Sequence, residues 1–191
     1  MATLFVDKVD PQSGTSLEIG SSGDTISVPT GASLTVPSGG LSGQNYPAFE
    51  AYVSTTTTIS DNTFTKVQFD TEVYDTDSCY DNSTNYRFTP TVAGKYFVHS
   101  SLIVESDTAR RIEYANCTIY KNGSEVHRVT PVYSADNISW QTTGVIGKVI
   151  EMNGTTDYLE MYLRCNVFSG SPKYIGNDSK YSSFGAYRIG S

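Results

Sequence analysis

Three acidic side chains lie close together in the sequence and could hold a metal ion. Asp75, Asp77 and Asp81 follow a segment, residues 65–74, that alternates like a β-strand. Hard cations such as calcium prefer oxygen-rich loops of this kind. The spacing does not match an EF-hand-type loop, so an exposed acidic turn is the preferred interpretation. Calcium is the single cofactor that the sequence leaves open, and we otherwise expect none.

Few other side chains are suited to catalysis. The two histidines, His99 and His127, fall within predicted strands, and neither has a Cys or a second His at metal-ligand spacing. No Gly-x-Ser-x-Gly, His-Glu-x-x-His or phosphate-binding glycine loop occurs. The sequence therefore predicts a protein that is not an enzyme, with a glycan depolymerase as the minor alternative.

The three cysteines, Cys79, Cys117 and Cys165, are widely spaced. An odd number at such spacing is neither a disulfide framework nor a metal signature. Cys117 and Cys165 fall on the apolar side of alternating strands, which is typical of small buried thiols. A disulfide between these two stays open, because it requires neighbouring strands and suitable geometry.

Aromatic side chains are abundant and could bind a partner. The chain has 14 Tyr, 8 Phe and 1 Trp. Aromatic rings stack on the apolar surfaces of ligands such as sugars, and they are also enriched in obligate protein interfaces. We favour a trimer interface over a sugar-binding platform for the following residues: Tyr96, Trp140, Tyr158, Tyr162 and Tyr187.

Charge and composition exclude some partners. The chain has 13 Lys and Arg against 20 Asp and Glu, a net charge of −7, and Arg110-Arg111 is its only adjacent basic pair. Nucleic-acid binding needs a basic patch, so nucleic acid is excluded as an expected partner. No apolar run approaches the length of a membrane span, so we expect no membrane insertion. Few charges and many β-forming residues favour an all-β protein.

The first 40 residues differ from the rest. They contain no Tyr, Trp or Cys, and short β-prone units alternate there with Gly and Pro. Each unit offers only two apolar side chains, so it needs stacked repeats or partner chains. We predict an attachment or trimerisation segment over residues 1–40, with an unstructured tail as the alternative. A linker over 41–45 and a head over 46–191 would follow. The anchoring residues would be Leu17, Ile19, Ile26, Val28, Leu34 and Val36.

Beyond residue 45, apolar and polar residues alternate with period two. The clearest run is 157–168, where Leu159, Met161 and Leu163 share one face. Asn122-Gly123 lies between two such runs and is a strong hairpin signal. No helix of four turns with a consistent apolar face is found. These patterns alone predict a β-sandwich or barrel.

A set of motifs in residues 46–189 resembles the globular head of complement component C-one-q, one of the tumour-necrosis-factor-like jelly rolls. Segments 47–52, 120–123 and 183–187 resemble the first strand, central hairpin and closing strand of that family. The resemblance implies an all-β, ten-strand, two-sheet jelly roll that assembles as a homotrimer. The aromatic motif keeps the family spacing except that its fourth residue comes one position late: Phe69, Asp75, Tyr80, Phe88, Gly94 and Tyr96.

The N-terminal segment carries a second resemblance. Residues 1–7 and 22–29 are similar to the starts of short structural proteins of tailed phages. No basic start or apolar core of a signal peptide occurs in residues 1–20. The resemblance implies a virion surface protein, assembled in the host cytoplasm, that binds other virion proteins through its N-terminal segment.

Three functions are compatible with this organisation. The first is a fibre or spike protein whose head binds a host surface glycan or receptor. The second is a capsid decoration protein or head fibre on the phage shell. The third is a soluble lectin-like binding module. Many weak sites on one particle would raise the avidity in the first case.

Overall fold

The computed structural model describes residues 9, 13–14, 17, 19–34, 46–106, 112–130, 139–168, 170–176 and 181–190. The chain divides into two compact units, Met1–Ser42 and Gly43–Ser191, and we call the second the head unit. Every regular element in the described ranges is a β-strand. A search of those ranges finds no helix that could cross a membrane.

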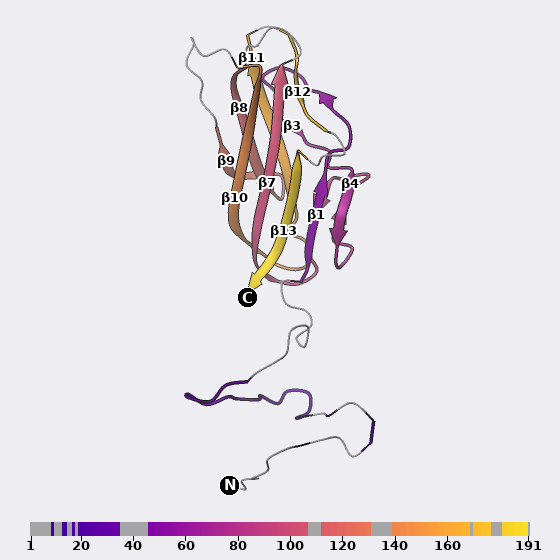
Figure 1. Ribbon diagram of the computed structural model, residues 1–191, viewed down its shortest axis with the longest axis vertical. Helices are drawn as coiled ribbons and strands as arrows, with labels where there is room; N and C mark the ends of the chain where they lie inside the picture. The colour runs from indigo at the N-terminus through magenta and orange to yellow at the C-terminus, as the bar shows by residue number, and fades with distance from the viewer. Residues whose placement is uncertain are drawn as a thin grey trace. The chain divides into compact units, whose positions relative to one another are not determined.

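The head unit is built from two antiparallel sheets (Figure 1). In the seven-stranded sheet, β10, β7, β13, β1 and β4 lie side by side, and β12 and β2 extend it from the end of β7. Its strands are β1 (Ala48–Tyr52), β2 (Thr57–Thr58), β4 (Thr71–Asp75), β7 (Gly94–Ser106), β10 (Gln141–Met152), β12 (Pro172–Tyr174) and β13 (Ser183–Gly190).

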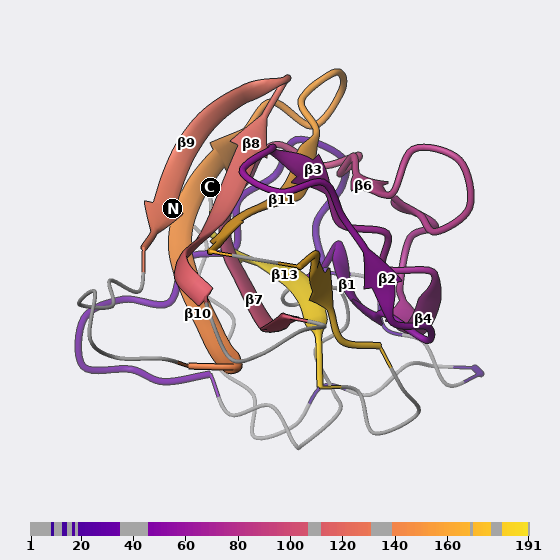
Figure 2. The ribbon, with the colours of Figure 1, turned by 90° about the horizontal axis from the view of Figure 1, so that it is seen from above.

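The six-stranded sheet forms the second layer, which Figure 2 shows from above. Its central strands run in the order β6, β11, β8 and β9, with β5 beside β6 and β3 beside β11. Its strands are β3 (Thr65–Lys66), β5 (Tyr80–Asp81), β6 (Arg87–Phe88), β8 (Ile112–Lys121), β9 (Ser124–Val129) and β11 (Leu159–Val167).

This arrangement confirms the predicted all-β, two-sheet jelly roll. The described part of the chain has thirteen strands rather than the expected ten, because several edge segments pair over only two or three residues. The hairpin at Asn122-Gly123 joins β8 to β9, and both residues have the positive φ that such a tight turn needs. Gly94 opens β7 with a φ of 146°, where a Cβ would lie 2.3 Å from the Gly190 carbonyl oxygen.

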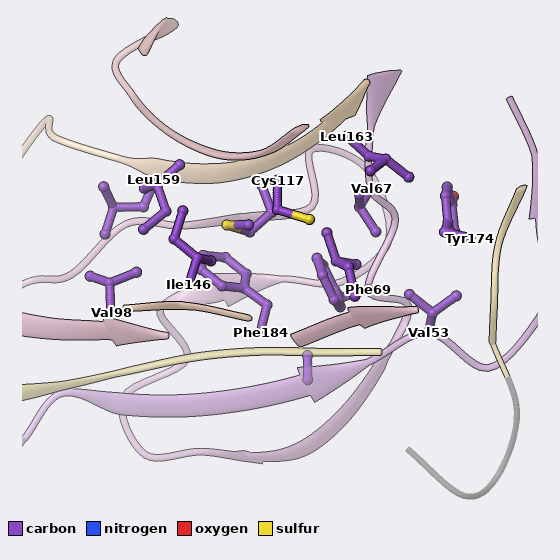
Figure 3. Close-up of a cluster of buried hydrophobic side chains, with 14 of the residues drawn as sticks. Val53, Val67, Phe69, Val98, Cys117, Ile146, Leu159, Leu163, Tyr174 and Phe184 are labelled. Atoms are coloured by element: carbon purple, nitrogen blue, oxygen red, sulfur yellow. The ribbon is translucent and has the colours of Figure 1, made fainter. Parts of the chain in front are cut away.

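The core lies between the sheets and is rich in aromatic rings. Phe49 of β1 stacks on Tyr80 and on Phe88, each at 4.5 Å between ring centroids. Phe184 of β13 meets Phe49 edge to face at 5.0 Å. These rings are fully or almost fully buried, so the motif positions of the sequence are core positions. Figure 3 shows side chains from both sheets, among them Cys117 and Phe184, pointing into one cluster.

The sheets come very close where β10 passes β8. Gly144 of β10 faces Cys117 of β8, and a Cβ on Gly144 would lie 2.1 Å from the Cys117 Sγ atom. A glycine is therefore required here for the sheets to keep their spacing. All three cysteines are free and buried. Cys117 lies opposite Leu163 and Cys165 opposite Ala115, so the two thiols are diagonal neighbours on adjacent strands.

The N-terminal unit has turns instead of strands in residues 19–34. Asp24 N donates to Ser21 O at 2.9 Å, and Ala32 N donates to Pro29 O at 3.0 Å, with Gly23 and Gly31 at positive φ in the turns. The β-prone units expected between these turns are not paired in the single chain. Of the predicted anchoring residues, Val36 lies outside the described residues and the others are exposed: Leu17, Ile19, Ile26, Val28 and Leu34.

Candidate functional site

The outer face of the seven-stranded sheet carries a group of apolar and aromatic side chains that we call the aromatic face. Strand register aligns Phe97 of β7 with Val149 on one side and Tyr187 on the other. Phe97 lies 5.6 Å from Tyr187 and 6.0 Å from His99 between ring centroids. Val145 is 65% exposed and Val149 46% exposed, although both lie in the middle of a long strand.

Two glycines let the rings of the aromatic face lie down on the sheet. His99 pairs with Gly147 of β10 and with Gly185 of β13. A Cβ on Gly185 would lie 2.7 Å from His99 Nε2, and one on Gly147 would lie 3.3 Å from Phe97 Cζ. The face is therefore flat, which suits packing against another protein surface.

His99 is the titratable ring at the centre of the aromatic face. Burial lowers its pKa below the usual 6.5, and Glu50 opposes this shift. The imidazole is therefore held in its neutral form near neutral pH, consistent with an apolar surface. No pair of groups around it resembles a catalytic base and nucleophile in the described part of the chain.

The outer face of the six-stranded sheet differs and is called the arginine face. Arg128 of β9 and Arg164 of β11 lie over the Phe64 ring, with guanidinium carbons 5.1 Å and 5.5 Å from its centroid. Tyr120 lies 6.2 Å from Phe64 and 4.3 Å from Tyr162. Such cation–π contacts contribute about 0.5–1 kcal/mol each at exposed sites.

Two polar atoms beneath these side chains lack a partner among the described residues. Asn116 is 4% exposed and Thr118 is fully buried, and the Asn116 Oδ1 and Thr118 Oγ1 atoms accept or donate no hydrogen bond. Their neighbours Ala115, Cys117 and Ile119 point into the core, so these two side chains point to the arginine face. An unsatisfied buried polar group costs about 1–3 kcal/mol.

The predicted calcium ligands accept hydrogen bonds from separate parts of the head unit. Asp75 accepts from Tyr80 N at 2.7 Å, and Asp77 accepts from the Thr91 hydroxyl at 3.2 Å. Asp81 accepts from the backbone N–H groups of residues 83–85, and the bond from Thr84 leads in lowering its pKa well below the usual range. Within the described ranges, no three acidic, His or Cys side chains are grouped to hold a metal. The acidic-turn interpretation fits this geometry.

The predicted interface aromatics do not form one surface. Tyr96 is fully buried in the core, where its hydroxyl donates to Val92 O at 2.7 Å, so it cannot be an interface residue in the folded head. Tyr187 lies on the aromatic face, while Tyr162 lies on the arginine face with Tyr158, which packs under Arg87 at 4.6 Å. Trp140 is 52% exposed just before β10.

Several residues of the two faces were missed in the sequence. The missed residues of the aromatic face follow the pattern Val145-Gly147-Val149, whose alternation places two exposed valines around a glycine. That signal was available, but exposed valines resemble core valines until the register is known. The other missed residues are Phe97 on the aromatic face and, on the arginine face, Phe64, Asn116, Thr118, Arg128 and Arg164.

A depression of about 460 Å³ lies at one end of the sandwich. Lys121 Nζ pairs with Asp157 at 2.8 Å and donates to Glu151 O at 2.7 Å at its wall. Burial raises the pKa of Asp157, but hydrogen bonds from Lys121, Asn122 and Asn153 outweigh it and lower the pKa overall. Its lining offers no nucleophile with an adjacent base. The buried thiols are also unreactive, because burial raises the pKa of Cys117 and Cys165 to about 12 each.

Solved structures with the same fold were found. Murine APRIL at pH 8.0 matches with a TM-score of 0.54 and 11% identity, covering 74% of this chain and 98% of that chain. Eiger TNF from S. frugiperda matches at 0.52 and 12%, covering 74% and 91%. The globular domain of zebrafish complement 1qA protein matches at 0.50 and 14%, covering 75% and 97%.

Sequence comparison adds nothing to this likeness. No protein-family model matches the chain, and no curated protein matches it. Identities of 11–14% carry the fold and no activity. The chain therefore contains a jelly roll of the fold seen in tumour-necrosis-factor-like proteins and complement heads.

Proposed function

We propose that this chain is a non-enzymatic, homotrimeric surface protein of a tailed-phage virion, a fibre or spike whose head unit binds a host surface glycan or receptor. The aromatic face is the observation that carries the trimer. It places Phe97, Val149 and Tyr187 in one row on the outside of a sheet. An apolar patch of this kind on a soluble head favours burial against a partner.

A second copy of the same chain is the partner that the fold supports. Jelly rolls of the tumour-necrosis-factor and complement type commonly assemble as homotrimers, and the fold is the same here. Closed symmetry lets one patch be covered in every copy. Three heads in one particle then present three binding sites, which raises avidity without a new contact.

The N-terminal unit supports attachment to another protein. Its apolar side chains Ile19, Ile26 and Leu34 are between 65% and 71% exposed in the single chain. The two turns, at residues 21–24 and 29–32, repeat after eight residues. Equivalent segments of three chains, or a groove on another virion protein, would cover these side chains.

Two alternatives remain proposals of the same kind. A capsid decoration protein or head fibre would use the same N-terminal unit on the phage shell. A soluble lectin-like module would use the head alone. Electron microscopy of particles carrying a labelled copy of the chain separates these functions: density at the tail supports the fibre, density on the shell supports decoration, and unlabelled particles favour the soluble module.

Mass measurement in solution tests the trimer. The intact chain has a mass of 20.8 kDa, and light scattering should give three times this value. Val149→Lys places a charge on the aromatic face and should give a folded monomer. Val92→Lys is the matched control, since Val92 is exposed in the loop before β7 and not on that face. A wild-type monomer, or a trimer that tolerates Val149→Lys, contradicts the proposed assembly.

A further inference from the structure

The strip of the arginine face above β8 is unusual because polar atoms are buried there without partners. Asn116 Oδ1 and Thr118 Oγ1 lie on its floor, on the central strand of the three long strands of the sheet. A protein normally satisfies such groups or replaces them by apolar ones. We call this region the β8 strip and ask which molecule would complete it.

Two arginines form the walls of the β8 strip. Arg164 lies opposite Asn116 on β11, and Arg128 lies opposite Thr118 on β9. Neighbouring strands are about 4.8 Å apart, and Asn116 and Thr118 are two residues apart on β8, so the two wall residues start about 10 Å apart across β8 and about 7 Å apart along it. That width accommodates one ring between the guanidinium groups, and Phe64 stands there now.

Phe64 is held less firmly than the rest of the strip. It precedes β3, a strand of two residues, and follows the turn at Asn62, whose φ is 54°. Its side chain is half-buried, and its described ring contacts are with Tyr120 and the two arginines. A rotation about the side-chain torsions would remove Phe64 from the strip without breaking a ladder of a long strand.

The groups of the β8 strip together select a ligand class. An amide oxygen and a hydroxyl on the floor suit hydroxyl donors. Guanidinium walls suit a carboxylate, which they bind in bidentate geometry. The neighbouring rings of Tyr120 and Tyr162, 4.3 Å apart, offer faces for the C–H surface of a pyranose.

We propose that the β8 strip binds one acidic sugar unit, a hexuronate, with Asn116 and Thr118 as its floor, Arg128 and Arg164 as its walls, and Phe64 as a side chain that swings aside. This inference rests on the proposed function, because it names the glycan class and the place where the head takes it. Glu125 forms an ion pair with Arg128 and competes with the sugar carboxylate for that wall.

Calorimetric titration of the full chain tests the ligand class. The probe is trigalacturonate, and maltotriose is the neutral probe of the same length. The acidic sugar should bind, more weakly as salt is added, and the neutral sugar should bind at least about tenfold more weakly, as expected for loss of charge-assisted hydrogen bonds. Equal binding of both sugars, or binding of neither, overturns the proposal.

Substitutions in the strip test its location. Arg164→Gln should weaken trigalacturonate binding at least about tenfold. Arg87→Gln is the matched control, because Arg87 also packs on a tyrosine of this sheet but lies outside the strip, and it should change binding less than about twofold. Equal losses in both variants overturn the location.

Thr118→Val separates a binding role from a structural one. The change removes the unpartnered hydroxyl at nearly constant volume, so it should raise the midpoint of thermal unfolding while weakening sugar binding. A lower midpoint with unchanged binding would mean that water already satisfies the hydroxyl, and it overturns the proposal.

Two further variants should gain affinity. Glu125→Gln releases Arg128 and removes a competing charge. Phe64→Ala removes the side chain that must move. In the wild type, only the fraction of molecules with Phe64 swung aside can bind the sugar, and the variant would remove this reduction of the apparent affinity. Tighter binding in both supports the proposal, and weaker binding in Phe64→Ala shows that Phe64 is a stacking platform and overturns its swinging role.

The outcomes distinguish this inference from the proposed function. Each variant is also measured by light scattering, because the β8 strip lies on the sheet opposite the aromatic face. If the chain is a trimer but does not bind trigalacturonate, the sugar site is overturned and the proposed trimeric fibre is unaffected. A monomer that binds it overturns the trimer and leaves the site standing.

Discussion

The two outer faces of the sandwich place their aromatic rings in opposite settings. On the aromatic face, Phe97 and His99 lie over glycines of the neighbouring strands, and exposed valines continue the surface. On the arginine face, Phe64 and the tyrosines lie beneath or beside guanidinium groups. The rings of the first surface lie on glycines, whereas those of the second lie against guanidinium groups.

This difference changes how each face interacts with water. Exposure of a flat apolar face to water is unfavourable, so burial of that face against another protein is strongly favourable. A face whose rings are covered by charged side chains remains exposed to water at a small cost in free energy. A ligand could replace the contacts between those side chains and the rings. The comparison predicts that changes on the two faces have separable effects.

The largest expected effect comes from the core, because its packing determines the spacing of the two sheets that carry the faces. Gly144→Ala would place a methyl group 2.1 Å from the Cys117 Sγ atom, on the opposite sheet. Overpacking of this kind costs about 1–3 kcal/mol of unfolding free energy. Denaturant unfolding of Gly144→Ala, Cys117→Ala and the double variant measures it. The double variant should recover most of the loss relative to Cys117→Ala, and additive losses would show that the sheets do not meet at this point.

The next effect tests whether the stability of the six-stranded sheet depends on the ion pair between Lys66 and Glu160. Lys66 Nζ lies 2.6 Å from Glu160 Oε1, and the Glu160 side chain is only 6% exposed. Lys66→Met should leave that carboxylate unpaired and cost about 1–2 kcal/mol, reduced by the partial exposure of the pair.

The control for this pair lies on the other sheet. Glu50→Gln changes a charge beside the aromatic face, and we expect an effect within about 0.5 kcal/mol. Urea titration of both variants measures the two changes in unfolding free energy. A larger loss in Glu50→Gln than in Lys66→Met would reverse the comparison of the two sheets.

The core was predictable from the sequence, and the faces were not. Alternation along residues 157–168 and the turn at Asn122-Gly123 are local signals, so the strands and the hairpin could be predicted. Tyr96 shows the limit: its residue type suits both a core and an interface, and the register of β7 with β10 and β13 decides that it points between the sheets. Which side of a strand faces outward depends on register with distant strands, and a slip of one residue exchanges the faces.

The candidate sites depend on the same long-range register. Asn116 and Thr118 are ordinary polar residues in the sequence, and they stand out only because β9 and β11 bury them. Asp75, Asp77 and Asp81 are close in the sequence, but each carboxylate accepts hydrogen bonds from a different segment: Asp75 from Tyr80, Asp81 from the turn that follows it, and Asp77 from the distant Thr91. Proximity along the chain therefore does not by itself define a site.

The third effect is a pH dependence confined to the aromatic face. Burial lowers the pKa of His99 below 6.5, so the unfolded chain binds a proton more readily than the folded chain. Folding stability should therefore fall as the pH drops below 6.5, until the folded pKa is passed. Unfolding midpoints measured across this range should lose part of their slope in His99→Gln. Equal slopes in the wild type and His99→Gln would remove His99 from this role.

The smallest expected effect separates the flatness of the aromatic face from the folding stability of the head unit. Gly147→Ala would place its Cβ 3.3 Å from Phe97 Cζ, the far end of a ring that can shift by a few tenths of an ångström. The ring would rise from the sheet, while the alanine would gain about 0.5–1 kcal/mol in the strand from reduced unfolded-state entropy. Unfolding of the head should therefore change little, and the trimer should dissociate at higher protein concentration than the wild type in a dilution series. A variant that loses stability but keeps the wild-type dissociation profile would mean that the flat surface around Phe97 does not take part in assembly.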